Sequence, residues 1–292
     1  MSKEIGTIKA SLLNELNEEL DNKLAPEKAS AVKQFAHAYY AAASDSDMEA
    51  WRLDDLYGAT LESWQFIQSY QAEVPLVRVY NPRFDESGWQ STHTFIEILQ
   101  TDKPFLVDSL RMELNRRNLT IHAINNTVLT TSRDGDGNFL SIIDRSDEVA
   151  GSNRESLISV EVDRHSNKEQ LADLRSTILD ILNEVVSVVN DFPAMVEHCE
   201  KVIKSFDAPI AKLAKDEVSE AKEFLVWLKD HFTFLGYEEL KVVKKTGSTE
   251  LVAVENTQLG LLNMDNNAYA DRSMSKDITD VVKAASIEIF TF

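Results

Sequence analysis

Hydrophobic residues recur at helical spacing along the first part of the chain. Leu12, Leu16 and Leu20 lie four positions apart, which places them on one face of a helix. Pro26 indicates the start of another helix, because proline is tolerated in the first turn. Residues 7–72 are therefore predicted to form a small helical bundle.

The pattern changes at Val74 to the alternation of apolar and polar residues that is typical of strands. A helix predicted over residues 104–117 interrupts this alternation. The Asp-Gly pairs in residues 133–138 predict a hairpin turn, because glycine supplies the positive φ of tight turns. Strands are predicted over residues 74–80, 92–99, 119–130, 139–144 and 156–162. The order strand, helix, strand, strand, followed by a further helix, is ferredoxin-like.

A long helical stripe follows the last of these strands. Leu174, Ile178 and Leu182 lie on one face of a helix predicted over residues 167–206. Pro193 lacks a backbone donor, so it predicts that this segment breaks into two helices.

A second unit is predicted to begin with a helix near Lys215. A strand is expected over residues 231–242, with Gly236 as a bulge, and residues 250–254 are expected to pair with it. Residues 287–292 alternate in the manner of another strand. Because the chain stops within this pattern, we expect it to be a fragment of a longer protein.

The predicted fold class is α+β, in three parts. An N-terminal helical region occupies residues 1–72, and a ferredoxin-like βαββα module with a helical extension occupies residues 73–206. A second mixed α/β module covers residues 207–292, and we expect it to be cut short at its C-terminus.

Composition narrows the class of partner. The chain has 49 acidic and 30 basic residues and a net charge of −19. A surface for nucleic acid needs clustered Lys and Arg, so we expect neither a nucleic acid nor an anionic membrane as partner. A single cysteine, no apolar leader and no long apolar run predict a cytoplasmic protein.

No nucleotide or metal motif stands out. The nine glycines include no GxGxxG, and no phosphate-binding loop ends in Gly-Lys-Ser or Gly-Lys-Thr. The six histidines are scattered and form no HExxH. Asp134, Asp136 and Asn138 resemble the first half of a calcium loop, but Phe139 occupies the place of its glycine. We therefore predict no catalytic residues, no cofactor and no metal site in this segment.

Two pairs of residues suggest chemistry that a structural role explains better. His198 is next to Cys199, but adjacent residues on a helix point in different directions. Asp102 and Asp108 lie six positions apart at a predicted helix start. A cap and a first-turn acid are both favourable there, so we assign them no catalysis.

Residues 101–126, TDKPFLVDSLRMELNRRNLTIHAINN, form the most consistent stretch of the chain. Thr101 or Asp102 is expected to cap the helix, and Pro104 to lie in its first turn. Asn118 suits the left-handed residue that ends a helix. The core face of this helix is made by Leu106, Leu110 and Leu114.

The sequence DKPFLVDSL, followed by NRRNLTIH, resembles the opening of an ACT domain, a small regulatory module that often binds amino acids. The ACT pattern there is Asp-x-Pro-Gly-Leu-Leu. Phe105 replaces the glycine that lets the backbone approach a ligand, so it either crowds the loop or packs on the sheet. For an amino-acid effector the candidate groups are Asp102, Lys103, Asn125 and Asn126. Capping and strand-end solvation explain these four as well, and we favour that interpretation.

Residues 104–122 and 224–239 together resemble the N-terminal region of the large bacterial NAD-dependent glutamate dehydrogenases. The resemblance implies a parent enzyme that converts L-glutamate and NAD to 2-oxoglutarate, ammonium and NADH. Its catalytic residues would lie in a later, Rossmann-containing region. It also implies N-terminal ACT-like and PAS-like modules that serve assembly and allosteric control, so the second module is expected to be one or the other.

The sequence is compatible with three alternative functions. The first is a non-catalytic regulatory and assembly segment, whose partners are the rest of the parent chain and the other subunits of a homo-oligomer. The second is a freestanding amino-acid-sensing ACT protein. The third is a protein–protein assembly module without a ligand, which docks through exposed sheet edges or through the bundle of residues 7–72.

Overall fold

A computed structural model describes residues 8–143, 152–207, 214–245, 248–264 and 289–291. The chain forms two compact units, Met1–Asn183 and Glu184–Phe292. Among the described residues, no helix is both long and apolar enough to cross a membrane.

The first unit begins with four helices, and their shared apolar side also covers part of a sheet. Leu16, Phe35 and Trp64 belong to one buried cluster with Leu99 and Leu157 of the sheet. The helical region and the sheet therefore have a common core. The helices are α1 (Ile8–Lys23), α2 (Pro26–Tyr39), α3 (Asp45–Glu49) and α4 (Leu53–Phe66).

Five antiparallel strands form the sheet, in the order β1-β2-β5-β3-β4. Strand β5 lies between β2 and β3, so the strands on either side of the intervening helix run parallel to each other without pairing. The observed order from β2 onward is β2, α6, β3, β4, β5 and α7, so the fold mixes helices with an antiparallel sheet. Their bounds are β1 (Leu76–Tyr80), β2 (Thr94–Thr101), β3 (Ile121–Arg133), β4 (Phe139–Ile142) and β5 (Asn153–Val162), with a short helix α5 (Phe84–Ser87) before β2.

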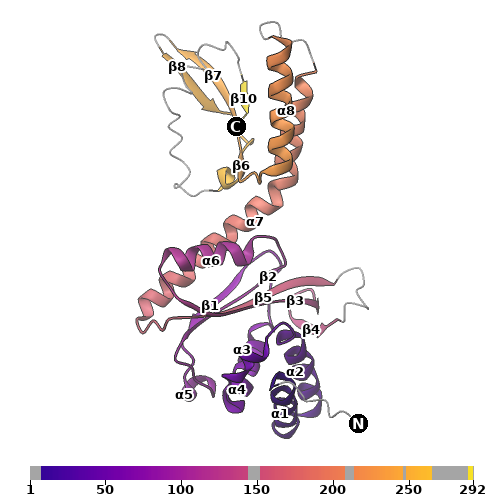
Figure 1. Ribbon diagram of the computed structural model, residues 1–292, viewed down its shortest axis with the longest axis vertical. Coiled ribbons are helices and arrows are strands. Elements are labelled where there is room, and N and C mark those ends of the chain that lie inside the picture. The colour runs from indigo at the N-terminus through magenta and orange to yellow at the C-terminus, as the bar shows by residue number, and fades with distance from the viewer. Residues whose placement is uncertain (1–7, 144–151, 208–213, 246–247, 265–288, 292) are drawn as a thin grey trace. The chain divides into compact units, whose positions relative to one another are not determined.

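Helices cover both faces of this sheet. Figure 1 shows α1 to α4 on one face, and α6 (Leu106–Arg116) with the first half of α7 (Lys168–Ser205) on the other. The apolar stripe predicted for α6 is buried, and so is the inward face of the first half of α7. These buried residues include Leu106, Leu110, Leu114, Leu174, Ile178 and Leu182. The apolar faces predicted for these two helices are therefore the faces that are buried.

The two edge strands of the sheet, β1 and β4, also hydrogen-bond on their outer sides to residues that are not part of its strands. Beyond β4, the backbone N–H of Tyr70 donates to the carbonyl of Gly137 (3.0 Å), and that of Phe139 donates to the carbonyl of Gln68 (2.9 Å). At β1, Nε of Arg175 donates to the carbonyl of Val77 at 2.8 Å. Parts of both edges are therefore already hydrogen-bonded within the unit.

The second unit contains the second half of α7, helix α8 (Lys215–His231) and short strands. Strand β7 (Glu239–Lys245) lies between β8 (Ser248–Ala253) and β10 (Ile289–Thr291) in a three-stranded sheet. Strand β6 (Gly236–Tyr237) pairs with β9 (Leu259–Gly260), which precedes a 3₁₀ turn (Leu261–Asn263). The predicted pairing of residues 250–254 with the preceding strand is confirmed by β7 and β8.

Two expected features of this region are wrong. Helix α7 continues through Pro193, because Val188 before the proline and Met195 after it are buried in one cluster with Tyr237. The strand expected over residues 231–242 starts only at Gly236 and is interrupted at Glu238. The interruption follows from pairing, since β6 and β7 belong to different sheets.

Candidate functional site

The loop between β2 and α6 contains the first two candidate effector residues. The carboxylate of Asp102 accepts hydrogen bonds from Oγ of Ser156 (2.8 Å) and from the guanidinium of Arg154 (3.2 Å). Its backbone N–H donates to the carbonyl of Arg154 (2.9 Å). Asp102 therefore ties the loop to β5.

Lys103 is fastened to the turn that precedes β1. Its Nζ lies 3.0 Å from a carboxylate oxygen of Glu73, and most of its side chain is buried. Glu73 itself has a left-handed backbone, with φ of 65°. The ion pair thus joins two turns at the same end of the sheet.

Phe105 has the backbone conformation of a glycine. Its φ is 70° and its ψ is −1°, and it is the residue that precedes helix α6. The side chain is 47% exposed, so it is not packed into the core of the sheet. The left-handed region is unfavourable for a residue with a Cβ. The loop therefore keeps the shape that a glycine at this position would adopt readily.

The cap expected for α6 is wrong. No side chain caps the helix at Phe105, and the helix begins at Leu106, after Pro104. The reason is that the Asp102 carboxylate is held by Ser156 and Arg154. At the other end the prediction is confirmed, because Asn118 is left-handed with φ of 56°.

Gln100 adds a buried polar group beside this loop. It is opposite Ser156 in the ladder and only 1% exposed. Neither atom of its side-chain amide hydrogen-bonds to any described residue. Buried amides normally have hydrogen-bond partners. The amide of Gln100 could therefore bind a ligand or solvent molecule beside this loop.

The remaining two candidates lie elsewhere on the sheet. The side-chain amide of Asn125 donates to the backbone carbonyl of Tyr39 at 3.0 Å, so it faces the helical region. Asn126 is exposed. Asn125 pairs with Ser159, whereas Thr101 pairs with Glu155. Four residues along a strand span about 13 Å, so the structure does not bring the asparagines together with Asp102 and Lys103.

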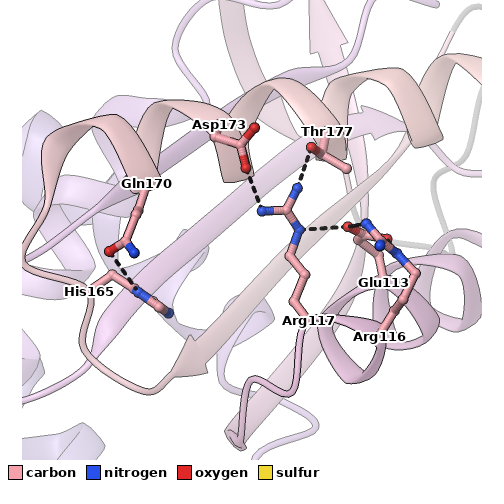
Figure 2. A network of polar contacts seen from close by, with 7 residues as sticks. All are labelled: Glu113, Arg116, Arg117, His165, Gln170, Asp173 and Thr177. Atoms are coloured by element: carbon pink, nitrogen blue, oxygen red, sulfur yellow. Dashed lines mark hydrogen bonds and ion pairs between the residues drawn. The ribbon is translucent and has the colours of Figure 1, made fainter.

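A polar network joins the end of α6 to α7. Figure 2 shows the Arg117 guanidinium between Glu113, Asp173 and Thr177, with a distance of 2.6 Å to each. Arg116 also binds Glu113, at 2.7 Å. The hydrogen bond with Arg116, and then that with Arg117, lower the pKa of the Glu113 carboxyl against the effect of burial. This network fixes the C-terminal end of α6, away from the loop.

Two histidines that are far apart in the sequence meet at the end of β5. The rings of His93 and His122 stack with centroids 4.1 Å apart. Nδ1 of His93 lies 3.1 Å from Oε2 of Glu161, and Nε2 of His122 lies 2.8 Å from Oδ1 of Asp163. The scattered order of the histidines concealed this group. The two histidines meet because their sequence neighbours, Thr94 and Ile121, both pair with Val162, and this pairing is visible only in the structure.

The two carboxylates beside these histidines have opposite pKa shifts. Burial raises the pKa of Glu161, although the hydrogen bond to His93 partly offsets it. Hydrogen bonds from Thr120, and then from His122, lower the pKa of Asp163 to about 2. Within the part of the chain that the structure describes, no group of three or more His, Cys, Asp or Glu residues is arranged to hold a metal ion.

The other motifs have structural roles. Oδ1 of Asp134 accepts from the backbone N–H groups of Asp136 and Asn138, both at 2.9 Å, which confirms the hairpin turn. His198 stacks on Tyr237, with ring centroids 4.2 Å apart. Burial raises the pKa of the Cys199 thiol, so the reactive thiolate is disfavoured.

Comparison with known proteins finds a family that matches part of this chain. Residues 35–178 match the family described as "Glutamate dehydrogenase, ACT1 domain". The match runs from α2 to α7, so it includes both the sheet and helices on each of its faces.

Two relatives match nearly the whole chain. The NAD-specific glutamate dehydrogenase of Halomonas elongata is 46% identical over 263 residues, which is 89% of this chain. That of Pseudomonas aeruginosa is 36% identical over 257 residues, or 88% of this chain. The chain spans only 16% of the length of each relative. The resemblance to the ACT-containing N-terminal region of the large NAD-dependent glutamate dehydrogenases is therefore confirmed, with a glutamate dehydrogenase ACT1 domain at residues 35–178.

Proposed function

We propose that this chain is a non-catalytic regulatory and assembly segment of a large NAD-dependent glutamate dehydrogenase. The observation that carries the proposal is the ACT1 match in a chain that spans 16% of the length of its relatives. The parent converts L-glutamate and NAD to 2-oxoglutarate, ammonium and NADH, with its catalytic residues and NAD site outside this segment. Its partners are the rest of the parent chain and the other subunits of a cytoplasmic homo-oligomer.

The proposed organisation keeps three parts. Residues 1–72 are the helical region, residues 73–206 the ACT-like domain with its helical extension, and residues 207–292 a second ACT- or PAS-like module. The antiparallel order β1-β2-β5-β3 supports the ACT assignment, because a βαββα unit with its third strand in the middle has this order. Regulation then acts through a module that is separate from the catalytic region.

Activity of the isolated chain tests the non-catalytic part of this proposal. Purified residues 1–292 are expected to show no glutamate-dependent reduction of NAD at any protein concentration. Turnover that scales with the concentration of this chain would contradict the proposal. Light scattering tests the assembly part, since self-association predicts a mass that rises with concentration, and a strict monomer would count against it.

A freestanding amino-acid sensor is the second candidate, and the loop after β2 favours it. In the sequence, Asp102 and Lys103 lie between Gln100 and Phe105. The amide of Gln100 has no partner among the described residues, and the backbone of Phe105 is left-handed. A ligand in this loop would raise the melting temperature in a saturable manner. Flat melting curves across the proteinogenic amino acids would exclude this function. The third candidate, an assembly module without a ligand, then remains.

A further inference from the structure

A cavity of about 550 Å³ lies within the first unit, between the helical region and the sheet. Its volume falls in the range of about 300–1,000 Å³ that is typical of small-molecule sites. Residues from α3, α4, the loop before β2 and the ends of β3 and β5 line it, and they include Trp51, Arg52, His93, Asn125, Ser159 and Glu161. The cavity is on the sheet face that the N-terminal helices cover, and the loop of Asp102 and Lys103 is not part of it.

One wall of the cavity is aromatic and fixed in place. The ring of Trp51 lies 5.8 Å from that of Trp89 and 6.5 Å from that of Phe95, between centroids. Trp89 and Phe95 are buried and meet edge to face at 4.9 Å. Nε1 of Trp89 donates to Glu62 at 2.5 Å, which holds its ring. A ligand therefore meets rings that are already ordered and need not lose side-chain freedom on binding.

The polar part of the cavity is acidic. Three carboxylates line it, those of Asp47, Asp55 and Glu161, against one permanent cation, Arg52. Glu161 comes from the sheet and is largely buried, and Oε2 is bound to His93. No hydrogen bond joins its Oε1 to another described group. The overall charge of −19 adds to the local excess of negative charge.

We propose that this cavity is a binding site for a small organic amine in its ammonium form, with Glu161 as the counter-ion and Trp51 as part of an aromatic wall. An ammonium group gains from a carboxylate and from the faces of aromatic rings, whereas a carboxylate ligand would be repelled by the three acids. The volume admits an apolar body beside the amine, and the rings supply the surface that this body would bury. The amine site is formed by residues of this chain alone and does not depend on whether the segment regulates a dehydrogenase.

Calorimetric titration of residues 1–292 with 2-phenylethylamine tests the proposal. Saturable binding is expected, while 2-phenylethanol and 3-phenylpropionate, which lack the ammonium group, are expected to bind at least about tenfold more weakly. A separate titration with L-phenylalanine distinguishes simple amines from amino acids. If the amino acid binds more tightly than the amine, a carboxylate is accommodated, and the proposal of an amine site is overturned.

Matched variants locate the site. Glu161→Gln removes the counter-ion with little change in shape and is expected to weaken binding of 2-phenylethylamine at least about tenfold. Trp51→Leu is also expected to weaken binding. Glu169→Gln, at an exposed residue of α7 outside the cavity, serves as the control and should leave affinity unchanged. Equal affinity of the wild type and Glu161→Gln, or no saturable binding up to about 10 mM amine, would overturn the proposal.

Discussion

The imidazole rings of His93 and His122 stack with their centroids 4.1 Å apart, although 28 residues of chain separate the two histidines. Each ring has a carboxylate partner of its own, Glu161 for His93 and Asp163 for His122. The two carboxylates differ in burial, since the side chain of Glu161 is 20% exposed and that of Asp163 is 49% exposed. Their opposite pKa shifts give a direct way to test this arrangement in solution.

The first prediction concerns the pH dependence of stability that Glu161 causes. Because its folded pKa is raised above 4.5, the folded state holds the proton more tightly than the unfolded state. Stability from this residue is greatest below the unfolded pKa and is lost as pH rises through the folded pKa. In urea unfolding, the free energy of the wild type minus that of Glu161→Gln should fall as pH rises above about 4.5. A difference that does not change with pH would contradict the prediction.

Asp163 should behave in the opposite manner. Its folded pKa is lowered from 3.8 to about 2, so its contribution to stability is present above the unfolded pKa and is lost as pH falls through the folded one. The free energy of the wild type minus that of Asp163→Asn should therefore decrease as pH falls from about 4 toward 2. An increase over the same range would show that the hydrogen bonds to Thr120 and His122 do not hold this carboxylate.

Replacement of Phe105 tests the strain in the loop. Phe105→Gly relieves a left-handed conformation that costs an L-residue about 1–2 kcal/mol, although the greater freedom of glycine in the unfolded chain offsets part of this gain. A net rise of about 0.5–1 kcal/mol in the free energy of unfolding is expected. Phe105→Ala is the control, because it removes the ring but retains Cβ, and it should bring no such gain. Equal effects of the two variants would indicate that the ring determines stability here.

The two glycines of the β3–β4 turn should respond differently to alanine. A Cβ on Gly137, which has φ of 83°, would lie 2.3 Å from the carbonyl oxygen of Tyr70, whereas one on Gly135 meets nothing within 4 Å. Gly137→Ala is therefore expected to destabilise the protein by about 2 kcal/mol or more, and Gly135→Ala by less than about 0.5 kcal/mol. Denaturant midpoints measured in parallel test this. Similar losses for both would contradict the close approach of the turn to Tyr70.

Arg117 and Arg116 provide a matched pair at the end of α6. Arg117 also contacts α7, and its side chain is 24% exposed, against 69% for Arg116. Arg117→Ala is expected to cost about 1–2 kcal/mol, a range already reduced for solvent screening. Arg116→Ala should have a small effect, since Arg117 still satisfies Glu113. Urea unfolding at low and high salt measures both, and a greater loss for Arg116→Ala would contradict the network in Figure 2.

Local patterns predicted the elements of the first unit well. Ile158, Val160 and Val162 alternate along β5, and all three are buried, as such alternation requires. The same holds for the leucines of α6 at helical spacing. The spacing of apolar residues within a strand or helix shows which of its faces meets the core. This spacing can be read from a short stretch of sequence.

The features that the sequence did not predict depend on distant contacts. Pro193 stays inside α7 because the residues on both sides of it are packed against Tyr237. Asp102 does not cap α6, because Ser156, 54 positions away, holds its carboxylate. The cavity beside Glu161 requires residues of α3, α4, the loop before β2 and the ends of β3 and β5 to meet. No spacing rule within one element could have shown any of these.

The hydrogen bonds along the sheet edges have a consequence for how copies of this chain can associate. An open edge is a template on which a foreign strand can add, and this is a common start of aggregation. Here the backbone of residues 68–70 lies against the β4 side, and Arg175 occupies a carbonyl of β1. An incoming strand would have to displace these groups first. Self-association by strand addition at these positions of the sheet is thus disfavoured.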